Sequence, residues 1–401
     1  MKKIIILFSL ILLQSATSVA QGAWSQKASM GGLARHRPFT FSIGLRGYLG
    51  CGWNGVTMYG DFWEYDPASN SWQQKADYPA GPRLSAFGFS IGNKGYAGTG
   101  LDEFLYSQSD FYEYNPITNS WSAKASFPGT PIFAASATVV GTKAYVCFGD
   151  DWDLGYMRYN NLWEYNPSTN AWAFKSPCPG FPRRDAVAFT IGTKAYFGTG
   201  NDDSYLETSD FWEYSPATDT WTQKANFAGT DRSQAVGFAI NGKGYIGTGG
   251  QLDEQDFFEY DPNTNSWRGV DIFPGSGREN SAALVIDNRA YVTCGTNGIN
   301  YRDLWEFNPY MITKTVERLI EMNISVYPNP MKEKATIELT SSKKIINASW
   351  QLMDSQGKQV ASENISELKF QINKNNLTSG IYLLNIKNDQ HIIASKKIII
   401  Q

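Results

Sequence analysis

An internal repeat of 46 to 51 residues is the feature that most limits what this chain can fold into. Six tryptophans mark its copies, namely Trp24, Trp72, Trp121, Trp172, Trp221 and Trp267. A period in this range indicates a unit of supersecondary structure that cannot bury its own hydrophobic surface and must pack against neighbouring copies. The chain therefore has a repeat architecture, and the content of one unit decides which kind.

Each repeat carries the signals of four short strands, which we name a, b, c and d in chain order. Strands a and b form a hairpin, as in residues 187–200, where apolar residues flank the turn Gly192-Thr193. An aromatic-Glu-aromatic triplet then marks strand c, and a turn such as Asn-Pro-Ser-Thr-Asn at 166–170 leads into strand d with its tryptophan. The triplets contain Glu64, Glu113, Glu164, Glu213, Glu259 and Glu306.

The strand count predicts a closed ring. Strands a, b and c occur six times, but no d strand follows the last triplet, because the sequence changes in kind after Pro309. The segment around Trp24 has the d pattern and stands alone at the start of the repeats. We expect it to complete the sixth unit, since closing the ring removes two exposed sheet edges.

This pattern resembles the kelch family over about residues 22–310. The a–b hairpin that ends in glycines, the Tyr-x-Pro-x-Thr-Asn turn and the following tryptophan carry the resemblance. The Gly-Gly pair of the family is mostly Gly-Thr-Gly here, with a true pair at Gly249-Gly250. The resemblance implies an all-β chain with a six-bladed kelch β-propeller over residues 21–310, in which the strand around Trp24 closes the sixth blade.

The first twenty residues have the pattern of a signal peptide. Lys2 and Lys3 precede the apolar run 4–13, and the small residues Ser18-Val19-Ala20 follow. A spanning helix needs about 20 apolar residues, so the run is too short to be a membrane anchor. We expect residues 1–20 to be removed and the rest to be exported, with no transmembrane anchor.

The segment that follows the repeats has a different pattern. We interpret residues 311–322 as a linker and residues 323–401 as a small β-sandwich (Ig-like), because short alternating strands are separated by turns such as 354–357 and 378–380. Its motifs are Val-Tyr-Pro-Asn-Pro at 326–330, Leu-Thr-Ser-Gly-Ile-Tyr at 377–382 and Lys-Lys-Ile-Ile-Ile at 396–400. This segment resembles the C-terminal sorting domain of the type IX secretion system. The alternative is an ordinary carbohydrate-binding or adhesion sandwich.

The sorting-domain resemblance implies that the type IX machinery handles the chain through residues 323–401. Secretion or attachment to the outer cell surface would follow. The charge balance differs between the two parts: the 91 residues from Met311 onward hold 12 basic and 8 acidic side chains, whereas the preceding 310 hold 23 and 30. An acidic body disfavours nucleic acid as a partner, because phosphate binding depends on a basic surface.

Histidine content excludes several catalytic chemistries. His36 and His391 are the two histidines, and they fall in different predicted domains. Kelch propellers of the galactose-oxidase type use two histidine ligands for copper, which one histidine in the propeller cannot supply. A Ser-His-Asp triad and a His-Glu-x-x-His zinc site are likewise missing from the sequence. We therefore expect no catalytic residue, no metal and no cofactor, and lean against an enzyme.

Two other sets of residues are interpreted as structural. Cys51 and Cys294 occupy the same repeat position in blades that become neighbours on ring closure, and we favour buried thiols over a disulfide between them. A basic residue sits in every a–b hairpin: Arg46, Lys94, Lys143, Lys194, Lys243 and Arg289. We expect these side chains to pair with the glutamates of the c strands, at little net gain in stability.

The d–a connections carry the candidate ligand-binding residues. The predicted set is Arg35, Arg37, Arg83, Arg183, Arg184, Arg232 and Arg278, together with Trp53 and Trp152 from the b–c connections. Blade three breaks the series with Pro131-Ile132. These connections share one face of a kelch propeller, where arginines, carboxylates and aromatic rings suit a glycan or a peptide. The alternative is that each arginine merely pairs with neighbouring carboxylates and carbonyls.

These observations favour an exported, monomeric binding module for glycan or protein ligands that performs no catalysis. A second reading is a sugar-processing enzyme that resembles the kelch sialic-acid mutarotases and epimerases. In that family arginines hold the sugar carboxylate, but no residue here can be matched to that site. A third reading is a purely structural or adhesive surface protein, since a fold does not determine a function.

Overall fold

A computed structural model describes residues 22–153, 155, 157–309, 322–341, 348–354, 358–375, 377–388 and 391–401. The expected signal peptide and nearly all of the expected linker lie outside this set. The chain divides into two compact units, Met1–Thr313 and Lys314–Gln401. Every regular element in the described residues is a β-strand, and none of them is a helix.

The first unit contains six four-stranded antiparallel sheets. Sheet 1 is β2 (Phe39–Ile43), β3 (Arg46–Gly50), β4 (Phe62–Asp66) and β5 (Ser71–Gln74). Sheet 2 is β6 (Phe87–Ile91), β7 (Lys94–Gly98), β8 (Phe111–Asn115) and β9 (Ser120–Ala123). Sheet 3 is β10 (Ser136–Val140), β11 (Lys143–Cys147), β14 (Leu162–Asn166) and β15 (Ala171–Lys175).

The second half of this unit repeats the arrangement. Sheet 4 is β17 (Val187–Ile191), β18 (Lys194–Gly198), β20 (Phe211–Ser215) and β21 (Thr220–Gln223). Sheet 5 is β22 (Val236–Ile240), β23 (Lys243–Gly247), β24 (Phe257–Asp261) and β25 (Ser266–Gly269). Sheet 6 is β26 (Ala282–Ile286), β27 (Arg289–Thr293), β28 (Leu304–Asn308) and β1 (Ala23–Lys27). Two short pairs lie between them, β12 (Asp150–Asp151) with β13 (Met157–Arg158) and β16 (Arg183–Arg184) with β19 (Asn201–Asp202).

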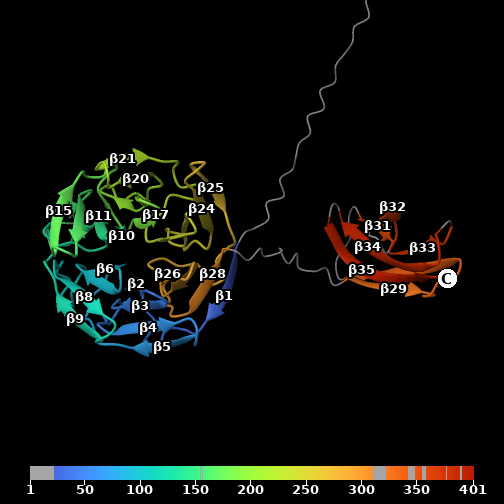
Figure 1. Cartoon of the computed structure of the whole chain (residues 1–401), viewed down its shortest axis with the longest axis horizontal. Helices are drawn as coiled ribbons and strands as arrows, with labels where there is room; N and C mark the ends of the chain where they lie inside the picture. The colour runs from blue at the N-terminus through green and yellow to red at the C-terminus, as the bar shows by residue number, and fades with distance from the viewer. Residues whose placement is uncertain are drawn as a thin grey trace, which may run out of the picture. The chain divides into compact units, whose positions relative to one another are not determined.

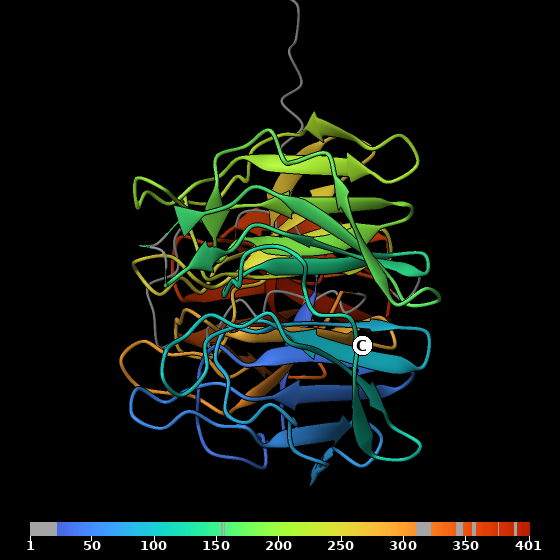
Figure 2. The ribbon, with the colours of Figure 1, turned by 90° about the vertical axis from the view of Figure 1, so that its left-hand side faces the viewer.

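The sheets surround a common centre, with strands β2, β6, β10, β17, β22 and β26 innermost (Figure 1). Each innermost strand contacts the next one in this order, and β26 contacts β2. Seen from the side, the strands run across the unit and the turns lie at both of its ends (Figure 2). The expected pairing at the start of the chain is present: Trp24 lies opposite Phe307 in the β1–β28 register.

Three sets of hydrogen bonds run from sheet to sheet and return to their starting point. In the innermost set, one backbone N–H per sheet donates to the carbonyl of the preceding sheet at 2.9–3.1 Å. The donors are Arg37, Ser85, Ala134, Asp185, Gln234 and Asn280. A second set joins Gly52, Gly100, Gly149, Gly200, Gly249 and Gly295 to the next sheet at 2.8–3.0 Å. The third uses the indole N–H of the six repeat tryptophans.

Aromatic packing explains why the repeat keeps its glycines and its turn. In strand β7, a side chain at Gly95 would lie 2.1 Å from the ring of Phe41, so glycine lets the neighbouring sheet approach. The turn asparagine Asn70 has a φ of 49°. Its side-chain oxygen accepts from the Tyr65 hydroxyl and from the N–H of Ala28 in sheet 6, both at 2.9 Å. The turn therefore fixes its own hairpin and the adjacent sheet together.

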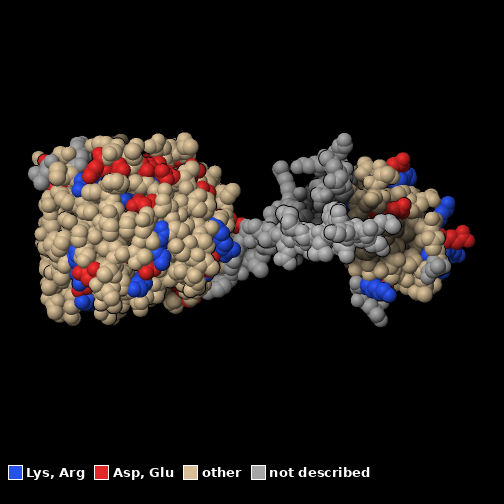
Figure 3. All heavy atoms as spheres, turned by 90° about the horizontal axis from the view of Figure 1, so that it is seen from above, with Lys and Arg blue, Asp and Glu red and all other residues tan. Residues whose placement is uncertain are grey.

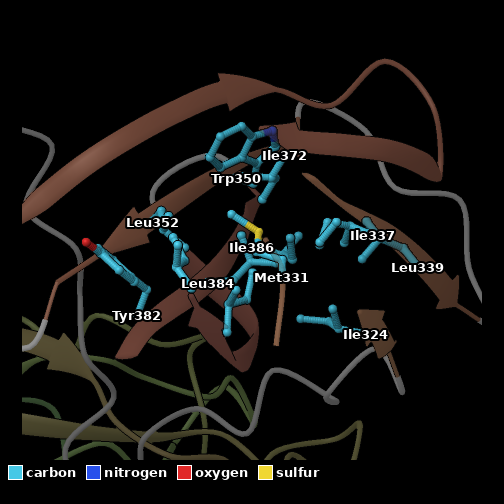
Figure 4. Packing of buried hydrophobic residues seen from close by; sticks show 13 residues of the cluster. Ile324, Met331, Ile337, Leu339, Trp350, Leu352, Ile372, Tyr382, Leu384 and Ile386 are labelled. Carbon is cyan, nitrogen blue, oxygen red and sulfur yellow. The ribbon is translucent and has the colours of Figure 1, made fainter. Parts of the chain in front are cut away.

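The second unit is a sandwich of two sheets. One sheet has the order β29 (Met322–Tyr327), β30 (Lys334–Ser341), β33 (Lys369–Asn373). The other has the order β32 (Gln359–Asn364), β31 (Ala348–Met353), β34 (Gly380–Asn388), β35 (His391–Ile400). Buried side chains from both sheets meet between them, including Ile337 of β30, Trp350 of β31 and Leu384 of β34 (Figure 4).

The Tyr-Pro-Asn-Pro motif of this unit holds the end of the chain. Asn329 Nδ2 donates to the carbonyl of Lys397 at 3.0 Å, and Asn329 Oδ1 accepts from the N–H of Ile399 at 2.8 Å. Met331 continues the contact, because its N–H donates to Ile399 and its carbonyl accepts from Gln401. Two of the motifs named above, 326–330 and 396–400, are therefore bonded to each other.

Candidate functional site

The b–c and d–a connections lie on one face of the first unit, which we call the loop face. In an antiparallel meander these connections leave the same end of each sheet. Bridges between them confirm the proximity, as between Leu84 and Leu101 and between Glu279 and Thr296. The b–c connections span residues 51–61, 99–110, 148–161, 199–210, 248–256 and 294–303.

Five of the predicted ligand-binding arginines are buried beneath this face. Arg35, Arg83, Arg183, Arg232 and Arg278 are 0 to 2% exposed. Each forms a bidentate pair with an aspartate that directly precedes strand c: Asp61, Asp110, Asp210, Asp256 and Asp303 respectively. A further donation reaches the end of strand b, as from Arg83 Nη1 to the carbonyl of Thr99 at 3.0 Å.

Each pair uses both carboxylate oxygens of its aspartate. Burial alone would raise the pKa of Asp61 and Asp210, but hydrogen bonds and charge from Arg35 and Arg183 outweigh it and lower both. Aromatic rings cover the cations, with Tyr59 at 4.1 Å from the Arg35 guanidinium carbon and Tyr301 at 4.0 Å from that of Arg278. This geometry fits a framework that fixes the connections rather than a surface that receives an anion.

Sheet 3 lacks both members of the pair. Ile132 stands where the other sheets have arginine, and Asn161 stands where they have aspartate. The backbone circle persists, because Gly100 donates to the Ile132 carbonyl at 2.8 Å. Ile132 is 3% exposed and packs in the cluster that contains Phe127. The joint loss of both partners is the sequence signal that the arginines are paired within their own sheet.

The remaining predicted arginine of sheet 1 lies at the centre of the face. Arg37 belongs to the innermost hydrogen-bonded circle, whose members have φ values of 53° to 59°. Its Nη1 donates to Asp185 Oδ1 and to Ser85 Oγ, both at 3.1 Å. Asp185 belongs to sheet 4, so this ion pair spans the circle. Left-handed backbone at non-glycine residues is costly and clusters at functional sites.

A pocket of about 160 Å³ opens at this centre. Each sheet contributes two consecutive residues to its lining, which is Arg37-Pro38, Ser85-Ala86, Ala134-Ala135, Asp185-Ala186, Gln234-Ala235 and Asn280-Ser281. The first residue of each pair lies on the circle and is mostly polar, whereas the second is small. The pocket thus offers a cation, a carboxylate, amides and hydroxyls around one opening.

Arg184 links the pocket to a buried cluster in sheet 3. Its Nη1 donates to Asp150 at 3.2 Å, and its Nε lies 3.5 Å from Asp185. Asp150 is fully buried and also accepts from Arg158 at 3.3 Å. Burial raises the pKa of Asp150 despite the opposing charge of Arg184. Arg158 lies under the Tyr205 ring at 4.5 Å.

The two predicted aromatic residues lie in the b–c connections of sheets 1 and 3. Trp53 is half-buried, exchanges two backbone hydrogen bonds with His36, and has its ring centroid 5.5 Å from the imidazole. Trp152 is 37% exposed and packs edge-on against Phe133 at 6.1 Å. Burial, aided by the charge of Arg37, lowers the pKa of His36 to about 4. The imidazole is therefore neutral at ordinary pH.

The repeat residues interpreted as structural are part of the sheets. Every triplet glutamate accepts from a tyrosine hydroxyl of strand b at 2.6–2.9 Å, as Glu64 does from Tyr48. The expected pairing with hairpin cations occurs at Lys143–Glu164 and Arg289–Glu306. The prediction is wrong for the other four sheets. Arg46 pairs with Asp66 and Lys243 with Asp261, while Lys194 donates to Ser215. The glutamates of these sheets pair with cations on or just after their d strands, in the pairs Glu64–Lys75, Glu113–Lys124, Glu213–Lys224 and Glu259–Arg268.

The four cysteines are free and buried, including Cys51 and Cys294. Among the described residues, no group of three or more His, Cys, Asp and Glu side chains has an arrangement that could hold a metal ion. The described part of the chain also contains no helix with the length and apolar character needed to cross a bilayer.

Comparison with known proteins identifies one part of the chain and the fold of the other. Residues 325–401 match the family described as the secretion system C-terminal sorting domain. Among curated proteins, none matches the chain. A solved structure titled "Structure of YjhT", a kelch-type propeller, is similar with a TM-score of 0.59 and 18% sequence identity, over 69% of this chain and 96% of that one. The chain thus joins a β-propeller to a sorting domain that implies handling by the type IX machinery and export.

Proposed function

We propose that this chain is an exported six-bladed kelch propeller that works as a non-catalytic binding module for a glycan or protein ligand. Its domains would be residues 21–310 and the sorting domain 323–401, after removal of the signal peptide 1–20. The sorting domain supports export, and the likeness to a solved propeller supports the fold. The six sheets and the three circles of hydrogen bonds support the blade count.

The central pocket is the observation that carries the proposal. Its lining places donors and acceptors from all six sheets around one opening. Arg37 and Arg184 are the two predicted arginines with side chains partly exposed, at 17% and 21%. We assign ligand contact to these two, with Trp53 and Trp152 as stacking surfaces, and a framework role to the five buried arginines. Polar groups and flat rings on the same face of a protein suit sugar hydroxyls or a peptide backbone.

A glycan array probed with the full chain tests this function. The variant Arg37→Gln removes the cation of the pocket, and Lys94→Gln is its control because that residue lies in an a–b hairpin at the opposite end of its sheet. We expect glycan binding to fall with Arg37→Gln and to persist with Lys94→Gln. Unchanged binding by both variants would show that the ligand binds outside the pocket.

One observation favours the enzymatic alternative, a sugar-processing activity like that of kelch sialic-acid mutarotases. Glu279 lies next to the pocket, and burial raises its pKa although Arg37 opposes the shift. A carboxylic acid with a raised pKa can serve as a general acid. Faster anomeric exchange of a reducing sugar, seen by NMR and lost in Glu279→Gln, would establish this second function.

A further inference from the structure

The loop face is acidic once its internal pairs are subtracted. The b–c connections contain 15 aspartates and glutamates but only Arg158 and Arg302 as cations. Five of these carboxylates are the framework aspartates, which the buried arginines neutralise. Asp150 and Asp151 are buried, and Asp150 pairs with Arg158 and Arg184. The other eight are exposed or partly exposed: Asp102, Glu103, Asp153, Asp202, Asp203, Glu207, Asp253 and Glu254. Figure 3 shows carboxylates gathered along one edge of the propeller unit.

The same connections expose large apolar side chains in every sheet. These are Val56, Phe104, Met157, Leu206, Leu252 and Ile299, with exposures of 91, 72, 55, 62, 82 and 67%. Among the turns at the opposite end of the sheets, Leu45 and Ile117 are the large hydrophobic residues exposed in the described structure. Exposed apolar side chains surrounded by polar groups are typical of interaction surfaces rather than of loops without a binding role.

We propose that the loop face docks a protein partner whose contacting surface is cationic and partly apolar. This inference rests on the proposed binding function and names its partner. Complementary charge steers association and rejects partners of like sign, so an acidic face selects a Lys- or Arg-rich surface and repels anionic glycans and lipids. The apolar residues come from all six sheets, which fits a broad protein surface better than one small ligand.

A labelled amphipathic peptide of leucine and lysine is the probe, with a leucine–glutamate peptide of equal length as its counterpart. Fluorescence anisotropy with the full chain should detect binding of the lysine peptide alone. Its affinity should fall about tenfold or more between about 0.05 M and about 0.5 M salt, because exposed charges are screened at the higher concentration. Equal binding of both peptides would overturn the proposal.

Two variants with the same net charge distinguish peptide binding at the loop face from attraction to the overall negative charge of the protein. The first neutralises exposed or partly exposed carboxylates of the loop face that have no framework role: Glu103→Gln, Asp203→Asn, Asp231→Asn and Glu254→Gln. The control neutralises four exposed carboxylates elsewhere: Asp287→Asn, Glu333→Gln, Glu363→Gln and Glu367→Gln. We expect the first variant to weaken peptide binding about tenfold or more and the control to change it less than about twofold.

The apolar contribution has its own pair of variants. Val56→Ser, Phe104→Ser and Leu252→Ser together should weaken the binding that remains at high salt, whereas Leu45→Ser, Ile117→Ser and Leu368→Ser together should not. A circular dichroism melt checks that all variants fold. If glycan binding at the central pocket persists while no variant affects the lysine peptide, the partner proposal fails and the proposed function stands. If glycan binding is absent but the lysine peptide binds through this face, the glycan part fails instead.

Discussion

Arg37 Nη1 lies 3.1 Å from Asp185 Oδ1, and this ion pair joins the first sheet to the fourth across the centre of the loop face. The two side chains are 17% and 8% exposed. Neither residue is adjacent to the other along the hydrogen-bonded circle, so the pair adds a contact that the circle does not provide. It places a fixed charge of each sign inside the central pocket.

We predict measurable coupling between these two residues. Arg37→Gln and Asp185→Asn should each lower the free energy of unfolding by about 1–3 kcal/mol, because each leaves a partly buried charged group short of a partner. The double variant should lose less than the sum, with a coupling of about 1 kcal/mol or more. Calorimetry of the propeller transition measures this cycle, and strictly additive losses would show that the pair adds no stability.

The framework pairs allow a test that copies sheet 3 into sheet 5. Asp256→Asn leaves the fully buried guanidinium of Arg232 without its counter-charge, which should cost about 3–5 kcal/mol. Adding Arg232→Ile reproduces the Ile132 and Asn161 combination and removes the unpaired charge. The double variant should therefore be more stable than Asp256→Asn alone in urea denaturation. A double variant that is less stable than the single one would mean that Arg232 stabilises the fold by more than its ion pair with Asp256.

The prediction from sequence succeeded where the repeat itself carried the information. Six recurrences of the strand pattern and one displaced d strand were enough to place Trp24 beside the last triplet, and the β1–β28 register agrees. Residues that face a neighbouring sheet alternate with residues that do not, and this alternation of apolar and polar side chains can be read directly from the sequence. The sorting domain was identified by its resemblance to a known family, and two of the motifs that carry this resemblance bond to each other at Asn329 and Ile399.

The site was predicted less well, because the position of a residue in the sequence does not specify the direction in which a long side chain points. The d–a arginines were expected to line the face, but Arg183 turns inward to Asp210, 27 residues later. A comparison of sheet 3 with the others could have revealed this, since Ile132 and Asn161 change together. The pocket residues gave no such signal, because the circle uses backbone groups and accepts side chains as different as Ala134 and Asp185.

Acid should destabilise the protein through His36. The pKa of His36 in the folded chain is about 4, below the ordinary value of 6.5. Between these two pH values the imidazole is protonated in the unfolded chain but neutral in the folded chain. Stability is therefore full above about pH 6.5 and declines as the pH falls towards 4. His36→Phe, which keeps a ring beside Trp53, should show a smaller loss of melting temperature between about pH 7 and about pH 4.5 than the native chain. Carboxylates such as Asp61 contribute a separate loss at lower pH, which the variant retains.

Ring closure predicts a large effect of a residue near the start of the repeats. The Trp24 indole packs against Phe257, Phe273 and Phe307 at centroid distances of 5.0 to 5.2 Å and donates to the Asp271 carbonyl at 3.2 Å. Trp24→Ala should cost about 3–5 kcal/mol, because it removes a large aromatic side chain from between two sheets. It should also leave β28 less well covered and speed hydrogen exchange in its outward-facing amides. Phe174→Ala is the matched control, since that aromatic residue also lies on a d strand but is 53% exposed. Exchange in β28 that stays as slow as in the native chain would show that the ring does not depend on its N-terminal strand.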